Sequence, residues 1–462
     1  MKSQNSKRKQ KKQDKKKEVK KTKKRIHNRQ KQLRKNLVFR LYKTIVHYFP
    51  DLFEQIRQIE DCRKKGDYEL AELITASIAL YLFKKGSRNA LNNERQHKKF
   101  EKNYRRIFKF RLPHMDTVDK VMRQLDESHL ESLKTELVKV LVRKKVFSKY
   151  RFLGNYYKVA IDGTHMMTVP EGHCDSCLHR TSKTGKVTYF HNVLEAKLVC
   201  DNGFAISLAT EWIENSDGEY DKQDCEQKAF IRLARKLKSS YCRLPLCIIA
   251  DGLYPNQTFF KICQDNNWIW TVTFQDGNLP SVWEEVRGLE KITEGNTRHS
   301  VEHVRGKEIH RTYVWINEID YKGFLLHWFE CLEEVDASKT RFVYISNVKV
   351  DYVNVLEITE TGRMRWKIEN EGFNIQKNHG YGLNHKYSRV SMTAAKNYYQ
   401  CMQIAHMINQ LFELGSLFKP LLQGKMTINH MWKIMLGQMR HTHLKKHKLE
   451  EFIEMNIQIR YG

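Results

Sequence analysis

An ordered series of short apolar segments, beginning at residue 158, is the feature that most constrains this fold. Residues 158–162 (KVAID), 191–200 and 204–213 (FAISLATEWI) each have the length and apolar pattern of a β-strand. An Asp-Asn-Gly turn at residues 201–203 joins the second strand to the third. Three strands in such close succession predict an antiparallel meander.

Helices and strands alternate after this meander. An amphipathic helix at residues 224–239 precedes a buried strand at 245–251 (PLCIIAD). A short helix at 256–266 precedes a further strand at 268–274 (WIWTVTF), and an irregular, strand-rich stretch continues to residue 356. Alternating elements of this kind predict an α/β domain.

Helical patterns flank this α/β region on both sides. Residues 37–150 read as helical, and we expect further helices at 361–378 and 393–414. Ser128 and Glu131 have the spacing of a capping box, which predicts that a helix begins there. Two short helices around this point are compatible with a DNA-reading helix-turn-helix and equally with an ordinary helical bundle.

Carboxylates stand at the ends of the first and fourth predicted strands. Asp162 closes the segment KVAID, and Asp251 closes PLCIIAD. A single aspartate at a strand end is most often a turn residue. A catalytic role for these two aspartates is indicated only when the segments around them are considered as well.

Five segments in a fixed order resemble the DDE transposases of bacterial insertion sequences. The resemblance covers most of the chain from residue 116 to the C-terminus, and LPHMDTVDKVM (112–122) precedes the core. It is strongest in the branch that carries a β-rich insertion between the last core strand and the catalytic helix. The segments are IDGTH (161–165), YFHNVLEAKLVCDNGF (189–204), KQDCEQKAF (222–230), ADGLYPNQTFFKIC (250–263) and RWKIENEGFNIQKNHGYGLNH (365–385).

The resemblance implies an α/β fold with a ribonuclease H-like catalytic core in two parts. The first part would span residues 151–275 and the second 357–392, with a β-rich insertion at 276–356 between them. We expect a helical domain that binds DNA ends before this core. The remaining parts are a basic tail at 1–36, that helical domain at 37–150 and a C-terminal helical region at 393–462.

The resemblance also implies a catalytic site of three carboxylates. Asp162, Asp251 and Glu369 would supply oxygen ligands to two Mg²⁺ (or Mn²⁺) ions. Two such ions can stabilise both the attacking and the leaving oxygen of an in-line phosphodiester displacement. Glu371 is a rival to Glu369, although two residues of helix turn it by roughly 200°.

The family pattern on the catalytic helix is Tyr-x2-Arg-x3-Glu-x6-Lys. Arg365 and Glu369 fit this pattern and lie one helical turn apart. Gly362 stands at the Tyr position, and Gln376 stands at the Lys position with Lys377 one residue later. We expect Arg365 to bind a DNA phosphate or to orient Glu369, and Lys377 to contact phosphate at most. The alternative for the Arg-Glu pair is an ordinary surface ion pair.

A second group of potential ligands lies in the loop after the first strand. His173, Cys174, Cys177 and His179 occur in the sequence HCDSCLH, and His191 follows downstream. Cys-x2-Cys spacing with histidines suits a tetrahedral Zn²⁺. Because a second Cys-x2-Cys is missing, two reduced cysteines in a loop remain the alternative.

The charge of the chain predicts a phosphate-rich partner. Its formal net charge is +29, and residues 1–35 contain eighteen Lys and Arg against two acidic residues. Such a tail either binds nucleic acid with release of counterions or is simply a solvated, disordered run. We expect the partner to be double-stranded DNA, at the element ends and at the target.

A soluble, intracellular protein is expected. The most apolar stretch, residues 70–83, reads as a core helix, and we expect no contact with a membrane. The ten cysteines are scattered through apolar patterns and favour reduced thiols. For a bacterial transposase this means the cytoplasm, in association with the nucleoid through DNA.

The sequence therefore predicts a cut-and-paste DNA transposase that binds terminal inverted repeats, cleaves the ends and joins them to a target. The resemblance implies a homodimer on paired ends, formed through helices around residues 393–422. Trp283, Trp315 or Trp328 in the insertion could stack on a flipped base, or all three could be core residues. Alternatives are a domesticated DNA-binding regulator without cleavage and a stand-alone metal-dependent nuclease.

Overall fold

A computed structural model describes residues 35–169, 174–215, 222–291, 295–304, 306–388, 390–422 and 426–461. The expected basic tail, residues 1–36, lies outside the described residues except for its last two. The chain divides into two compact units, Met1–Val121 together with Ile408–Gly462, and Met122–Met407. Within the described residues no helix is both long and apolar enough to cross a membrane.

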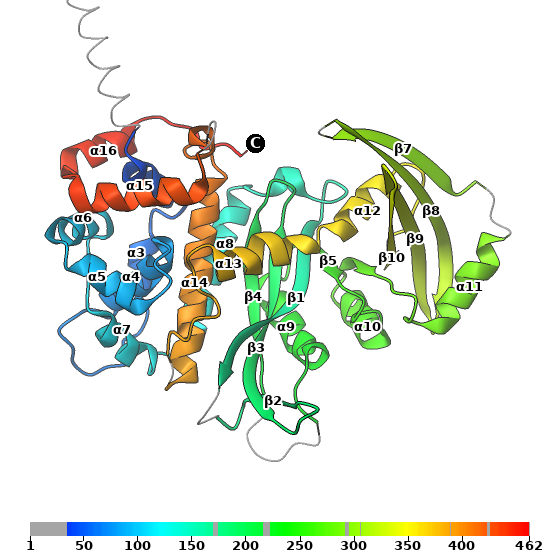
Figure 1. Ribbon diagram of the computed structural model, residues 1–462, viewed down its shortest axis with the longest axis horizontal. Helices are drawn as coiled ribbons and strands as arrows, with labels where there is room; N and C mark the ends of the chain where they lie inside the picture. Colours follow the sequence, from blue (N-terminus) through cyan, green and yellow to red (C-terminus); the bar gives the residue numbers. More distant parts are fainter. Residues whose placement is uncertain are drawn as a thin grey trace, which may run out of the picture. The chain divides into compact units, whose positions relative to one another are not determined.

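The first unit is helical, and the two ends of the chain build it jointly. In Figure 1 the red C-terminal helices lie beside the blue and cyan N-terminal helices. The α15 helix packs against α2 and α6, and α16 packs against α2. The helices of this unit are α2 (Leu37–Tyr48), α3 (Leu52–Arg57), α4 (Leu70–Leu82), α5 (Arg88–Arg95), α6 (Lys98–Phe108), α7 (Met115–Met122), α15 (Ile428–His441) and α16 (Lys446–Glu454).

Helix α4 forms the centre of this first unit. All thirteen of its residues are buried, which confirms the prediction of a core helix in this stretch. A helix that is apolar around its whole circumference has to be covered on every side. Its one acidic residue, Glu72, is paired with Arg111 at 2.6 Å.

The second unit contains a ten-stranded mixed sheet, so the α/β class predicted from the sequence is confirmed. The strand order is β2-β3-β1-β5-β6-β10-β9-β8-β7, and β4 pairs with β3 outside this path. The strands are β1 (Tyr157–Val169), β2 (Leu178–Thr181), β3 (Val187–Val199), β4 (Ala205–Ile213), β5 (Leu246–Ala250), β6 (Ile269–Thr273), β7 (Thr297–Val304), β8 (Lys307–Tyr321), β9 (Phe324–Val335) and β10 (Ser338–Ser346).

The predicted meander is confirmed as β1, β3 and β4, which pair in antiparallel fashion in chain order. The short strand β2 is an addition that the sequence patterns missed. Strands β5 and β6 lie parallel to β1 and to each other. Every residue of β4 and β5 is buried, as expected of strands covered on both faces.

Helices of the second unit cover the sheet and carry its crossovers. Both α8 and α9 pack on β4, and α12 contacts β5 and β6. A π-helix, Ile368–Asn374, contacts β1, β3 and β4. The α-helices are α8 (Glu127–Arg143), α9 (Glu226–Ser240), α10 (Gln257–Asp265), α11 (Pro280–Glu290), α12 (Val355–Arg363), α13 (Ile375–Asn378) and α14 (Met392–Glu413), the last of which crosses the boundary between the units.

The predicted capping box at Ser128 is wrong. Helix α8 begins at Glu127, and the side chain of Asp126 caps it by accepting a hydrogen bond from the backbone N–H of Ser128. Glu131 instead accepts a hydrogen bond from the backbone N–H of Thr210. The buried face of α8 packs on β4 through contacts such as Lys134, so this helix serves as a layer of the α/β unit.

The predicted helix at 361–378 is not continuous. Helix α12 ends at Arg363, the π-helix follows, and α13 completes the segment. Gly362 explains the close approach of α12 to the sheet, because a Cβ there would lie 2.6 Å from Cε1 of Tyr344 on β10. A tyrosine, which the transposase pattern has at this position, would therefore have no room at position 362, because the Tyr344 ring occupies the adjoining space.

The strands in the region expected to be an insertion belong to the same sheet as the other strands. Strand β10 pairs antiparallel with β6, which joins β7–β10 to the rest of the sheet. Trp283, Trp315 and Trp328 are exposed by only 7%, 4% and 1%, and Trp283 stacks on Phe274. Their burial agrees with the interpretation of these residues as core side chains.

Candidate active site

Strand register brings the first two predicted carboxylates to neighbouring positions. Strand β1 pairs in parallel with β5, and Ala160 is the register partner of Ile249. Asp162 and Asp251 each follow two residues later. Asp251 comes directly after β5, as predicted, but Asp162 does not end its strand, because β1 continues beside β3 to Val169. Both side chains are partly exposed, beyond the fully buried segments that precede them. The two predicted residues are thus held side by side by the backbone itself.

Arg365 connects the third carboxylate to this pair. Its Nη1 donates a hydrogen bond to Oε1 of Glu369 at 2.8 Å and lies 3.6 Å from Oδ2 of Asp162. Arg365 is only 7% exposed, whereas the Glu369 side chain is 40% exposed, so this i,i+4 ion pair is half-buried. The contacts of the π-helix with β1 place Glu369 in this position.

The electrostatics of Asp162 show that the carboxylates form one cluster. Burial raises the pKa of the Asp162 carboxyl to about 8, although the Arg365 guanidinium opposes the increase. The negative charges of Glu369, Glu226 and Asp251 contribute to this raised pKa. A partly exposed acid with three acidic neighbours is an arrangement that favours binding of a cation.

Glu226 is a member of this cluster that the sequence interpretation missed. It lies in the first turn of α9, and the hydroxyl of Tyr254 donates a hydrogen bond to its Oε1 at 2.9 Å. Its Oε2 lies 2.6 Å from the position that a Cβ on Gly163 would take, next to Asp162. Burial raises the pKa of Glu226. The segment KQDCEQKAF contained it, but nothing in that segment distinguished Glu226 from an ordinary helix-start glutamate.

The structure distinguishes Glu369 from its rival. Oε1 of Glu371 accepts a hydrogen bond from Nζ of Lys367 at 3.1 Å, one helical turn away. The charge of Glu369 helps to raise the pKa of Asp162, and Glu369 shares the guanidinium of Arg365 with Asp162. Glu369 is therefore the glutamate that the structure brings to Asp162.

Lys377 and Gln376 occupy different environments in α13, after the π-helix. Gln376 is fully buried, and its amide donates a hydrogen bond to Oε1 of Gln403 at 2.9 Å. Lys377 is half-buried and lies near the outer part of β1, where its charge adds to the effect of burial in lowering the pKa of His165. Gln376, at the lysine position of the pattern that the sequence resembles, thus anchors the segment to α14, while Lys377 lies at a partly exposed position.

A cavity adjoins Asp251 at the ends of β5, β6 and β10. Trp366 contributes the most exposed aromatic side chain of its lining, at 52%. The Arg365 guanidinium lies 4.2 Å from the centre of the Trp366 ring. The cavity is lined by Asp251, Phe274, Arg341, Tyr344, Arg365 and Trp366, among others.

The acidic cluster contains the type of donor atom that a hard divalent cation binds, but among the described residues its carboxylate oxygens are not gathered within 4.8 Å of one another. Asp162, Asp251 and Glu369 offer carboxylate oxygens, the ligands that Mg²⁺ and Mn²⁺ prefer. Arg365 lies between Asp162 and Glu369 and partly neutralises them. Binding of a cation by all three carboxylates therefore requires this guanidinium to move aside.

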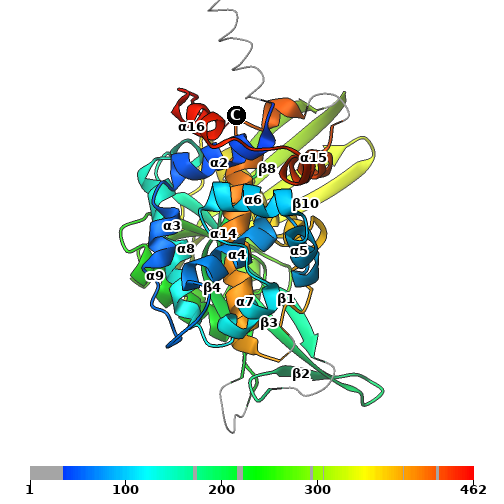
Figure 2. The ribbon, with the colours of Figure 1, turned by 90° about the vertical axis from the view of Figure 1, so that its left-hand side faces the viewer.

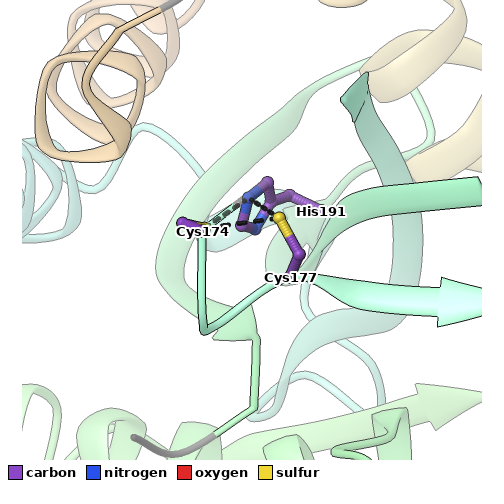
Figure 3. Close-up of side chains that lie close together, drawn as sticks. All are labelled: Cys174, Cys177 and His191. Carbon is purple, nitrogen blue, oxygen red and sulfur yellow. Dashed lines mark hydrogen bonds between the residues drawn. The ribbon is translucent and has the colours of Figure 1, made fainter. Parts of the chain in front are cut away.

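A tighter group of donor atoms is found at the second predicted metal site. Cys174, Cys177 and His191 point toward one another in Figure 3. In the described part of the chain they are the only three Cys, His or acidic residues whose donor atoms all lie within 4.8 Å of one another. His191 thus joins the two cysteines in place of His179, whose ring lies against Tyr189. His173 lies outside the described residues.

Comparisons with known proteins add no evidence about the role of these residues. The chain matches no family model and none of the curated proteins.

Proposed function

We propose that the protein is a cut-and-paste DNA transposase of the DDE type with a ribonuclease H-like catalytic core. One observation carries the proposal. Asp162 on β1 and Asp251 directly after β5 each follow the register pair Ala160–Ile249 by two residues, and Arg365 contacts the carboxylates of both Asp162 and Glu369. These are the three residues, in the three elements, that the resemblance to insertion-sequence transposases requires.

Sheet topology supports the same proposal. The order β4-β3-β1-β5-β6, with β3 antiparallel to its neighbours and β5 and β6 parallel to β1, fits a ribonuclease H-like core. Along the chain, α9 lies between β4 and β5, and α10 lies between β5 and β6, as such a core requires. Strands β7–β10 occur between β6 and the catalytic segment, where the family branch has its insertion.

The proposed chemistry is phosphodiester cleavage followed by strand transfer. Water would cut the element end and release a 3′-hydroxyl, which would then attack the target strand. Mg²⁺ or Mn²⁺ held by the three carboxylates would stabilise charge on the attacking and leaving oxygens. In the protein, Arg365 orients Glu369 and balances its charge, and Lys377 provides a cation for a DNA phosphate beside β1.

The proposed partners follow from charge and from family resemblance. A formal charge of +29 favours double-stranded DNA, both element ends and target, as the partner. We propose a homodimer that pairs two ends, in a bacterial cytoplasm where the protein associates with the nucleoid through DNA.

Metal-dependent cleavage of a duplex that carries the sequences flanking this gene tests the proposal. Glu369→Gln keeps the shape of the side chain but removes its charge, and we expect it to abolish cleavage in Mg²⁺. Glu371→Gln is the matched control, because it makes the same change two residues away on a side chain bonded to Lys367. We expect this control to retain cleavage.

Three other results would redirect the assignment. Loss of cleavage in Glu371→Gln and not in Glu369→Gln would overturn the proposed third carboxylate. Cleavage that ignores the terminal sequence would indicate a stand-alone nuclease. Sequence-specific binding by the intact protein with no cleavage in Mg²⁺ or Mn²⁺ would indicate a DNA-binding regulator.

A further inference from the structure

We propose that Cys174, Cys177 and His191 form a Zn²⁺ site that is separate from the acidic cluster. The two cysteines lie in the loop before β2, and His191 lies on β3. Their side chains converge on one point from these two segments (Figure 3). Thiolate sulfur with imidazole nitrogen is a donor set that favours zinc over magnesium or calcium.

The distances between the donor atoms are close to those around a tetrahedral zinc ion. The two Sγ atoms lie 3.3 Å apart, and Nε2 of His191 lies 3.4 Å from Sγ of Cys174 and 3.2 Å from Sγ of Cys177. Zinc bonds of ordinary length would set about 3.8 Å between two sulfurs and about 3.6 Å between sulfur and nitrogen. The site therefore needs to open by only a few tenths of an ångström, roughly 0.2–0.5 Å, to accept the ion.

The surrounding backbone holds the cysteines in this arrangement. The backbone N–H of Cys177 donates a hydrogen bond to the carbonyl of Cys174 at 3.1 Å, which closes a tight turn. Asn215 supports this turn twice, through its backbone N–H to Ser176 and through its Nδ2 to the carbonyl of Cys177. Because Cys177 and His191 are buried, little side-chain freedom is lost when an ion binds.

A bound ion would stabilise the part of the sheet in which β1, β2 and β3 extend beyond the pairing of β1 with β5. Strand β1 pairs with β5 only over Tyr157–Ala160 but follows β3 as far as Val169. The outer halves of β1 and β3, with β2, therefore extend beyond the sheet, as Figures 1 and 2 show from two sides. An ion bound by Cys174, Cys177 and His191 would fasten the loop before β2 to β3 within this part of the sheet, where His191 pairs with Met167.

Metal analysis of the full-length protein, purified in reducing buffer without chelators, tests the site directly. We expect about one zinc per chain, the stoichiometry of a single tetrahedral site. Cys177→Ser and His191→Gln should each lose this zinc. Cys242→Ser is the matched control, because Cys242 is an exposed free cysteine outside the cluster, and it should keep the full content. Replacement of zinc by Co²⁺ should give the thiolate-to-cobalt absorption bands of a tetrahedral site, which Cys177→Ser should weaken.

A further variant keeps the test decisive if the buried substitutions do not fold. Cys174 is exposed, so Cys174→Ser should fold and should still lose zinc. Wild-type protein without zinc, equal zinc in Cys174→Ser and Cys242→Ser, or a metal-free protein with a Cys174–Cys177 disulfide in its peptide map would each overturn the proposal. None of these measurements depends on DNA cleavage, so they stand apart from the proposed transposase activity.

Discussion

At the scale of single residues, two opposing effects act on the pKa of Asp162. Burial and three acidic neighbours favour its neutral form, and the guanidinium of Arg365 favours its charged form. The result is a raised pKa of about 8, so the carboxyl holds a proton that the unfolded chain releases near its ordinary pKa of 3.8. Stability without metal is therefore lost as the pH rises through the window between these two values.

Asp162→Asn is accordingly expected to stabilise the metal-free protein. Asparagine cannot ionise, so we expect Tm in EDTA to rise by about 2–5 °C at about pH 7.5. The increase should shrink as the pH falls and vanish below the ordinary pKa of 3.8, where both the folded and the unfolded state hold the proton. Thermal unfolding of this variant and of Asp265→Asn, an exposed aspartate on α10, measures the effect. A decrease in Tm for Asp162→Asn at about pH 7.5 would contradict the described environment.

Glu226 allows a second prediction at this scale. Glu226→Gln removes one negative charge beside Asp162, and we expect the Mg²⁺ concentration for half-maximal cleavage to rise by about 10–100-fold. Tyr254→Phe removes only the hydrogen bond to Glu226 and should give a smaller shift in the same direction. Metal titrations of the cleavage rate test both variants. An unchanged Mg²⁺ requirement in Glu226→Gln would exclude this carboxylate from the site.

At the scale of elements, local sequence patterns predicted those helices and strands whose formation depends on local interactions. The apolar runs of β4 and β5 and the amphipathic pattern of α9 identify strands and a helix without knowledge of their neighbours. The break between α12 and the π-helix could not be predicted, because it depends on contacts of Gly362 with Tyr344 and of Gln376 with Gln403. The capping box failed for a similar reason, since Asp126 caps α8 and Glu131 bonds to β4.

Because Gly362 lies close to the Tyr344 ring, we expect that adding a single methyl group at position 362 destabilises the protein. We expect Gly362→Ala to lower the free energy of unfolding by about 1–3 kcal/mol, because its Cβ would overlap the Tyr344 ring. Gly288→Ala on α11 is the control, since nothing lies within 4 Å of its Cβ, and it should stabilise or have no effect. Urea titrations that show the two variants to be equally stable would refute the close packing of α12 on β10.

At the scale of the whole molecule, the sequence predicted the α/β class but not the way in which the ends of the chain combine. Helices α15 and α16 complete the N-terminal helical unit, and a contact between α2 and α15 joins segments almost four hundred residues apart. No local pattern encodes such a contact. The candidate site was more predictable, because Asp162, Asp251 and Glu369 belong to recognisable segments, whereas Glu226 joins them only through folding.

The charge of the chain leads to a prediction at this same scale. Deletion of residues 2–34 removes most of the basic tail and keeps Asn36, whose side chain caps α2. We expect weaker non-specific DNA binding and a smaller slope of log K against log salt concentration. Binding titrations at several salt concentrations measure both quantities. If the slope stays the same, the tail does not contact DNA.

Strand transfer by the purified full-length protein tests the central claim most directly. Element-end DNA with a free 3′-hydroxyl is mixed with a target plasmid in Mg²⁺, and the joined ends are sequenced. We predict covalent joining of the 3′-end to the plasmid by the intact protein and none by Asp251→Asn. Joining that survives Asp251→Asn, or hydrolysis of the plasmid without any joined product, would contradict the account.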